Sequence, residues 1–277
     1  MGVLRLSEAG FVNYQKYSNF LAGNEPFFPV FDLLSSAPLW LDASDASTIT
    51  ESGGSVSQWD NKGTLENFTQ ATSADQPTTG VSTLNGLNVI DFASDFLSGS
   101  TKSQWKFLHD GTIYFMAAVV KYGTPTILSP LLGNNRTSTT DPGFVKFFDN
   151  RSSAAANEYI ISNSTGLPFP VAIIENSGIT SNTFVVDSAL LDPSNATAAN
   201  RIDYFINSTA GSDTNSSTAA LSSANPTYDL KIGEIGTSGS FAMTGSIAEL
   251  IIVSGADATE TNRQAVVDYL NEKWSVF

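Results

Sequence analysis

Hydrophobic residues gather in short runs along most of the chain, and these runs predict β-strands. Residues 112–120 are almost wholly apolar and predict a central strand, whereas residues 245–253 predict a half-buried one. We expect further strands at residues 39–42, 56–60, 87–92, 143–148, 159–162, 171–175, 184–186, 201–206 and 228–235. Short strands separated by Gly, Asn, Asp, Ser and Pro indicate an all-β sandwich and argue against a helical or βαβ fold.

One amphipathic helix is predicted, and it follows the last strand. Asp257 and Glu260 have the spacing of a capping box, which places the start of the helix here. Behind them, residues at three- and four-residue spacing form one face: Arg263, Val267, Leu270 and Trp274. Trp274 is therefore expected in the core, as are Trp40 and Trp59, which lie in strand patterns.

Three polar stretches are predicted to be loops, at residues 133–142, 187–200 and 209–225. The first 36 residues differ from all of these, because they are rich in aromatic residues without a clear period. Such a segment cannot form its own core, so it either lies over the main domain or docks on a partner subunit. We expect an extended arm at 1–36 and one domain at 37–277, with these residues anchoring the arm: Phe11, Tyr14, Tyr17, Phe20, Phe27 and Phe28.

Composition and charge exclude several classes of partner. The chain has 277 residues and a net charge of −14, which disfavours nucleic acids and anionic lipids, since both need a basic surface. The chain has no run of eighteen or more apolar residues, so we expect no membrane span. The N-terminus lacks the apolar region of a signal peptide, so none is expected. The chain has no cysteine, which excludes disulfides, thiolate catalysis and zinc–thiolate sites.

Four segments together resemble a laminin-G-like, concanavalin A-like jelly-roll domain. They are L-W-L-D-A-S-D at 39–45, V-S-Q-W-D-N-K-G at 56–63, N-V-I-D-F at 88–92, and the strand–helix unit at 247–274. The resemblance covers roughly residues 37–277. It implies a jelly-roll β-sandwich with a C-terminal helix, a fold common in bacteriophage virion proteins and in carbohydrate-binding modules of secreted bacterial proteins. Fold alone does not fix function.

Catalytic residues are not evident in the sequence. Glycosidases that this fold resembles carry several acidic residues on one strand, but Glu249 has no such partner, and we expect it at a sheet edge or beside the last helix. The single histidine, His109, precedes an Asp-Gly turn and is expected at the surface. No Gly-x-Ser-x-Gly motif is present. We therefore expect no enzymatic activity.

Two kinds of binding site are considered instead. Structural calcium is possible at Asp42, Asp45 and Asp60, although Asp42 and Asp45 suit Asx turns equally well. A glycan site needs an aromatic platform beside amide or carboxylate groups. The candidates for such a site are Trp105, Asn134, Asn135, Arg136 and Asp141, with the alternative that Trp105 packs beneath a loop.

These observations favour a non-enzymatic virion structural protein, such as a capsid decoration, fibre or tail appendage. It would be made in the host cytoplasm and displayed on the particle as a homo-oligomer. The arm would bind other virion proteins, and the sandwich would face host-surface glycans. The alternative is a carbohydrate-binding module of a secreted bacterial protein.

Overall fold

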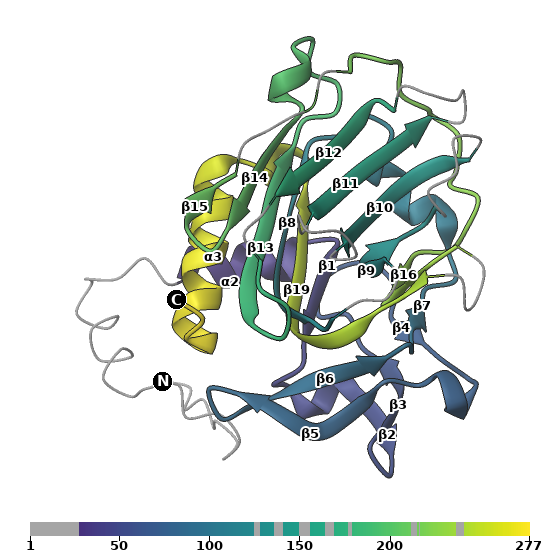
Figure 1. Ribbon diagram of the computed structural model, residues 1–277, viewed down its shortest axis with the longest axis vertical. Coiled ribbons are helices and arrows are strands. Elements are labelled where there is room, and N and C mark those ends of the chain that lie inside the picture. The colour runs from purple at the N-terminus through teal and green to yellow at the C-terminus, as the bar shows by residue number, and fades with distance from the viewer. Residues whose placement is uncertain are drawn as a thin grey trace, which may run out of the picture.

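Antiparallel strands arranged in two layers form the body of the molecule (Figure 1). The computed structural model describes residues 28–277, apart from 125–127, 136–140, 150–155, 164–168, 177–178, 212–214, 216 and 237–240. The all-β sandwich with a C-terminal helix, predicted from the strand pattern and the resemblance, is confirmed. The arm residues Phe11, Tyr14, Tyr17, Phe20 and Phe27 lie outside the described residues.

The first layer is built around two long strands that pair with each other. β8 (Tyr114–Tyr122) lies between β19 (Thr244–Ser254) and β13 (Phe184–Leu191). Successive stretches of β19 pair with two further strands, β6 and β1. The remaining members of this layer are β1 (Leu39–Asp42), β6 (Leu87–Ala93), β14 (Ile202–Ile206) and β15 (Thr209–Ala210).

The second layer lies over the first and has shorter strands towards one end. Its members, in pairing order, are β12 (Val171–Asn176), β11 (Ala156–Asn163), β10 (Pro142–Asp149), β9 (Ser129–Gly133), β16 (Lys231–Ile232), β7 (Leu97–Ser98), β4 (Phe68–Thr69), β3 (Ser55–Trp59) and β2 (Ile49–Ser52). β5 (Thr78–Leu84) pairs with β6 and touches β3, which joins the layers at this end. A separate hairpin consists of β17 (Glu234–Ile235) and β18 (Phe241–Ala242).

β8 is apolar along its length because both of its faces are buried. Met116 and Ala118 belong to the core between the layers, whereas Phe115, Ala117 and Val119 pack towards the helices on the outer face. A strand covered on both faces gives a continuous apolar run, because neither set of alternating side chains meets water. This explains why residues 112–120 do not alternate.

The predicted C-terminal helix is α3 (Glu260–Trp274), and it covers the outer face of the first layer. Val267, Leu270 and Trp274 are all fully buried. The predicted cap is wrong, however, because the side chain of Thr259 accepts from the amide of Asn262 at 3.2 Å, while Asp257 belongs to the preceding 3₁₀ turn. A threonine two residues later satisfies the first helical amides instead.

The loop predicted at 187–200 begins too early. β13 continues to Leu191, with Asp187 and Ser188 paired to Ala118 and Ala117 of β8. Both polar side chains are buried, Asp187 between the layers and Ser188 beneath α3, where it accepts from Arg263 at 2.9 Å. Polar residues are typical of loops, which explains the prediction, but the backbone of this stretch pairs with β8 in the centre of the first layer.

Residues 28–36 of the predicted arm form a helix, α2 (Phe28–Ser36), which begins at Phe28. Val30 and Leu34 are buried in the same apolar cluster as α3. The ring centre of Phe31 lies 6.2 Å from that of Trp40 and 5.6 Å from that of Tyr269. This end of the arm therefore packs on the sandwich. No described helix is both long and apolar enough to cross a membrane.

Candidate functional site

Trp105 does not provide an exposed aromatic platform. It lies in the 3₁₀ helix η3 (Lys102–Leu108) and its side chain is fully buried. Its indole nitrogen donates to Glu66 Oε1 at 2.8 Å, and its ring packs against Phe68 and Phe107. The prediction of a platform is wrong, and the alternative, in which Trp105 packs beneath a loop, describes its environment.

Three of the other predicted glycan-binding residues lie together where β9 and β10 are joined. Asn134 Oδ1 accepts from the amide of Phe144 at 2.8 Å, and Asn135 Nδ2 donates to the carbonyl of Asp141 at 2.9 Å. Asn134 and Asn135 are buried, so they hold the connection rather than offer amides to a ligand. Asp141 accepts from Thr227 at 2.9 Å. Arg136 lies outside the described residues.

Two of the three carboxylates considered for calcium, Asp42 and Asp45, pair with a lysine. Lys62 Nζ lies 3.2 Å from Asp42 and 2.9 Å from Asp45. Asp60 instead accepts from the side-chain amides of Gln58 and Asn67, at 2.6 Å each. Among the described residues, no group of three or more His, Cys, Asp or Glu side chains could hold a metal ion.

Glu249 lies in the middle of a sheet, not at an edge, because β19 is paired on both sides. Its buried carboxylate accepts from Trp40, Tyr269 and Trp274, at 2.7–2.9 Å, and pairs with Lys273 at 2.8 Å. Burial raises the pKa of Glu249, and the positive charge of Lys273 opposes that effect. This carboxylate fastens α3 to the sheet, as expected of a residue beside the last helix.

His109 is buried and not at the surface as predicted. Its Nε2 lies 2.9 Å from the carbonyl of Ala224, which fixes this nitrogen as the donor. Burial lowers the pKa of His109 and so favours the neutral ring. The side chain therefore ties η3 to the segment around Ala224.

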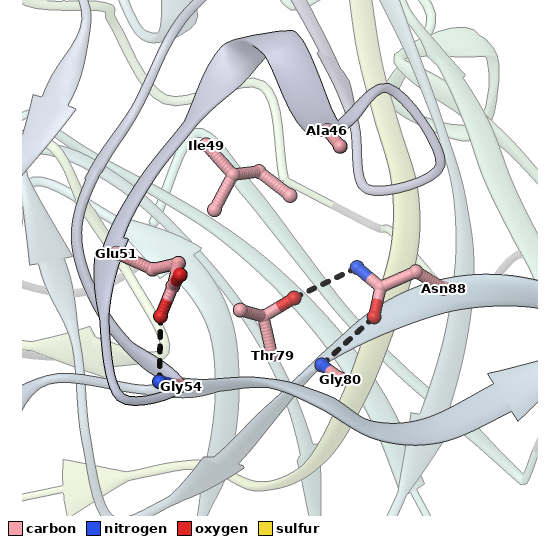
Figure 2. A pocket seen from close by; sticks show the side chains of 7 residues that line it. All are labelled: Ala46, Ile49, Glu51, Gly54, Thr79, Gly80 and Asn88. Atoms are coloured by element: carbon pink, nitrogen blue, oxygen red, sulfur yellow. Dashed lines mark hydrogen bonds between the residues drawn. The ribbon is translucent and has the colours of Figure 1, made fainter. Parts of the chain in front are cut away.

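An open pocket of about 500 Å³ lies between two β-hairpins (Figure 2). These hairpins lie at the end of the sandwich where the layers are joined (Figure 1). β2 and the turn that joins it to β3 form one wall, and β5 and β6 form the other. Figure 2 shows Ile49 and Thr79 between Glu51 on one side and Asn88 on the other. The lining residues are Ala46, Ile49, Glu51, Gly54, Thr79, Gly80 and Asn88.

Two-residue turns shape both hairpins. Gly53 and Gly54, with φ of 62° and 89°, join β2 to β3, and Asn85 and Gly86, with φ of 50° and 75°, join β5 to β6. Positive φ at both positions matches the twist of paired strands, and Gly and Asn adopt it readily. The turns thereby hold the strands that carry the pocket side chains.

Asn88 organises the wall formed by β5 and β6. Its Oδ1 accepts from the amide of Gly80 at 2.9 Å, and its Nδ2 donates to Thr79 Oγ1 at 2.8 Å and to the carbonyl of Ala43 at 2.9 Å. The register of the hairpin shifts between Thr79 and Thr83, so this amide replaces ladder bonds that the irregularity removes.

The pocket offers a carboxylate, a hydroxyl and the amide oxygen of Asn88 beside an apolar surface. Glu51 is exposed and accepts from the amide of Gly54 at 2.6 Å, a bond that uses only part of the capacity of a carboxylate. Thr79 adds a hydroxyl that accepts from Asn88 and keeps a proton to donate. Ile49 supplies the apolar surface. Such a set can orient a small polyhydroxylated ligand.

Sequence reasoning missed these pocket residues, although one signal was present. Asn88 is a polar residue near the start of the apolar strand 87–92, a position where a side-chain amide must find partners. Glu51 and Thr79 carry no comparable signal. They come together only because two hairpins from different layers meet.

No protein-family model and no curated protein sequence matches the chain. The fold is similar to that of domain 4 of AbnA, a GH43 extracellular arabinanase from Geobacillus stearothermophilus, solved in complex with arabinotriose. That match has a TM-score of 0.51 and 11% identity, and it covers 84% of this chain and 98% of the domain. The whole domain is therefore matched by most of this chain, which agrees with the β-sandwich described above.

Weaker likenesses involve sialidases. NanB sialidase from Streptococcus pneumoniae matches with a TM-score of 0.46 and 14% identity, over 64% of this chain and 26% of the sialidase. The CBM40 domain of Ruminococcus gnavus IT-sialidase, bound to α2,3-sialyllactose, matches with a TM-score of 0.41 and 14% identity, over 57% of this chain and 83% of that domain. This chain thus spans about a quarter of NanB. The predicted virion role and location stay predictions.

Proposed function

We propose that this protein is a non-catalytic carbohydrate-binding module that holds a saccharide in the pocket between the β2–β3 and β5–β6 hairpins. The observation that carries the proposal is the pocket lining, in which the carboxylate of Glu51, the hydroxyl of Thr79 and the amide oxygen of Asn88 lie beside the apolar side chain of Ile49. Sugar hydroxyl groups both donate and accept, so a mixed set of donors and acceptors complements them.

The likeness to the arabinanase domain supports the choice of ligand class. That domain, which has the same kind of fold, was solved with arabinotriose. Arabino-oligosaccharides are therefore the first ligands to test, within a wider panel of plant and bacterial polysaccharides.

A binding role is favoured over hydrolysis by the charge of the pocket. Glycoside hydrolysis uses a pair of carboxyl groups that flank the scissile bond. Glu51 is the one acidic side chain in the described lining. A single exposed carboxylate suits hydrogen bonding to a sugar, and we expect no turnover of any ligand that binds.

Isothermal titration calorimetry of the purified chain against the panel tests this proposal. Glu51→Ala and Thr79→Val should each weaken binding about tenfold, because each removes one hydrogen-bonding group worth about 1 kcal/mol or more. Asp268→Ala is the matched control: it removes an exposed carboxylate on α3 that accepts from Gln264 at 2.8 Å and lies outside the pocket lining. It should bind like the wild type. Absence of binding across the panel, or unchanged affinity in both pocket variants, would contradict the proposal.

A further inference from the structure

A charged cluster lies in the core between the two layers, and none of its residues lines the proposed saccharide pocket. Lys146 of β10, Asn157 of β11 and Asp187 of β13 are at most 1% exposed. Lysine is almost never fully buried, because removing its ammonium group from water is costly. The position of these three side chains therefore calls for a physical reason.

Aromatic residues enclose the cluster. Lys146 Nζ lies 5.1 Å from the ring centre of Tyr122 and 4.9 Å from that of Tyr159. The hydroxyl groups of the same two tyrosines donate to Asp187, at 2.9 Å and 2.7 Å. A third tyrosine, Tyr204, contacts Asn157 Nδ2. All three rings are nearly or fully buried, so the cluster is shielded from water.

The geometry places a nucleophile, an amide and a carboxylate in mutual contact. Lys146 Nζ lies directly against Asn157 Oδ1, at the carbonyl end of the side-chain amide. Asp187 Oδ2 is 2.8 Å from Lys146 Nζ and 3.0 Å from Asn157 Nδ2. One carboxylate oxygen therefore touches both the attacking nitrogen and the nitrogen that would leave.

We propose that Lys146 and Asn157 join in an intramolecular isopeptide bond, and that Asp187 is the catalytic residue that carries the protons. Lys146 Nζ attacks Asn157 Cγ, so a new C–N bond forms while the bond from Cγ to Nδ2 breaks. The lysine ammonium loses two protons and the departing nitrogen gains two, passed through Asp187. Ammonium leaves, Asp187 returns to its carboxylate form, and neither an oxidant nor a cofactor is needed.

The surroundings favour this step in two ways. Burial lowers the pKa of Lys146 against the opposing charge of Asp187, which favours the neutral amine that can attack. The strands also hold the reactants in place, because β10 and β11 are paired along their length and β13 faces them from the other layer. Fixed contact between reacting groups replaces a bimolecular encounter.

Two other partly buried lysines, Lys231 and Lys273, do not contact a side-chain amide in this way. Lys231 pairs with Glu234 at 2.6 Å, and Lys273 pairs with Asp42 and Glu249. These are carboxylate partners, which offer no amide to attack. If Lys146 and Asp187 formed a simple ion pair, the cluster would carry the desolvation cost of two buried charges. The bond converts the ammonium into a neutral amide, so that Asp187 is the one charge left in the cluster, and the hydroxyl groups of Tyr122 and Tyr159 donate to it.

Intact mass spectrometry of the purified full chain under denaturing conditions tests the proposal. The mass should be lower than that of the sequence by one molecule of ammonia, once any loss of Met1 is taken into account. Trypsin cuts after Arg136, Arg151 and Arg201 but not after an acylated lysine. The digest should therefore contain peptide 137–151 joined to peptide 152–201. A wild-type mass equal to that of the sequence, or a deficit without this joined peptide, would overturn the proposal.

Three variants complete the test. Lys146→Met and Asp187→Asn should both have the full mass of their sequences, because the first lacks the nucleophile and the second lacks the proton carrier. Lys231→Met is the matched control and should keep the ammonia deficit. A deficit that persists in Lys146→Met would place the loss elsewhere and would also overturn the proposal. The wild-type mass is decisive even if a core variant fails to fold.

Discussion

Glu66 shows how one partly exposed side chain can organise a buried region. Its Oε1 accepts from the indole of Trp105 at 2.8 Å and from the amide of Thr101 at 3.1 Å. Its Oε2 accepts from the amide of Ser100 at 2.7 Å and from the hydroxyl of the same residue at 3.0 Å. The carboxylate thus accepts hydrogen bonds both from the backbone amides just before η3 and from the buried tryptophan.

Replacing Glu66 with glutamine should destabilise the protein in a pH-dependent way. Burial alone would raise the pKa of Glu66, but the amide of Ser100 and the indole of Trp105 lower it below its ordinary value. The stabilisation is therefore present above the ordinary pKa of the carboxyl and is lost as pH falls through the lower, folded-state value. Glu66→Gln should cost about 1–3 kcal/mol at pH 7, and urea unfolding measures it.

The difference between Glu66→Gln and the wild type should shrink when unfolding is repeated near pH 3. Asp268→Asn, an exposed carboxylate with one side-chain partner, controls for the general effect of removing a negative charge. A Glu66→Gln penalty that stays constant from pH 7 to pH 3 would contradict the role given to the charged carboxylate.

The environment of Trp105 could not be predicted from its neighbours in the sequence. It lies in a polar stretch, between Gln104 and Lys106, which favoured an exposed ring. Its partner Glu66 is 39 residues away along the chain. Asp42 and Asp45 likewise pair with a residue that is distant in sequence, because Lys62 follows β3. Local pattern indicates which residues are polar, whereas their partners depend on the tertiary fold.

At the scale of elements, two variants distinguish the observed N-cap of α3, Thr259, from the predicted one, Asp257. Thr259→Ala should lower the free energy of unfolding by about 0.5–2 kcal/mol, because it removes the side-chain acceptor of the Asn262 amide. Asp257→Ala should change it by a few tenths of a kcal/mol, through the helix dipole alone. Chemical denaturation of both variants gives the comparison, and a larger loss in Asp257→Ala would contradict the assigned cap.

Elements whose pattern matches their burial were the ones predicted well. β1 has the bounds expected at 39–42, and the face of α3 that contains Val267, Leu270 and Trp274 is buried as its spacing indicates. β13 was cut short because Asp187 and Ser188 are polar and buried. A strand that carries buried polar groups violates the usual pattern. Here Asp187 belongs to the cluster around Lys146, and Ser188 accepts from Arg263 of α3.

At the scale of the whole molecule, the proposed pocket is the feature least accessible to sequence analysis. Its walls come from hairpins that meet only when the layers close, and its side chains are unremarkable in isolation. The Asn85–Gly86 turn is a strong hairpin signal, and it locates one wall. The other wall and the hollow between them depend on how the two layers are joined.

Light scattering of the full chain and of residues 28–277 tests the role predicted for the arm. We expect a defined homo-oligomer for the full chain and a folded monomer for residues 28–277. The aromatic residues at 11–27 are absent from the shorter chain, which keeps α2 with Val30 and Leu34 in the core. Two monomers would contradict an assembly role for the arm, whereas equal oligomers would place the contact in the sandwich.

The position of β19 in the centre of its sheet has a consequence for synthesis on the ribosome. β1 and β19 are neighbours, with Trp40 and Glu249 bonded across 209 residues of chain. β6 and β8 also pair with β19 and have no other partner on that side. The nascent chain must therefore carry unpaired strand edges until residue 254 emerges. Such edges attract other chains, so chaperone binding during translation is expected to govern the yield of this protein.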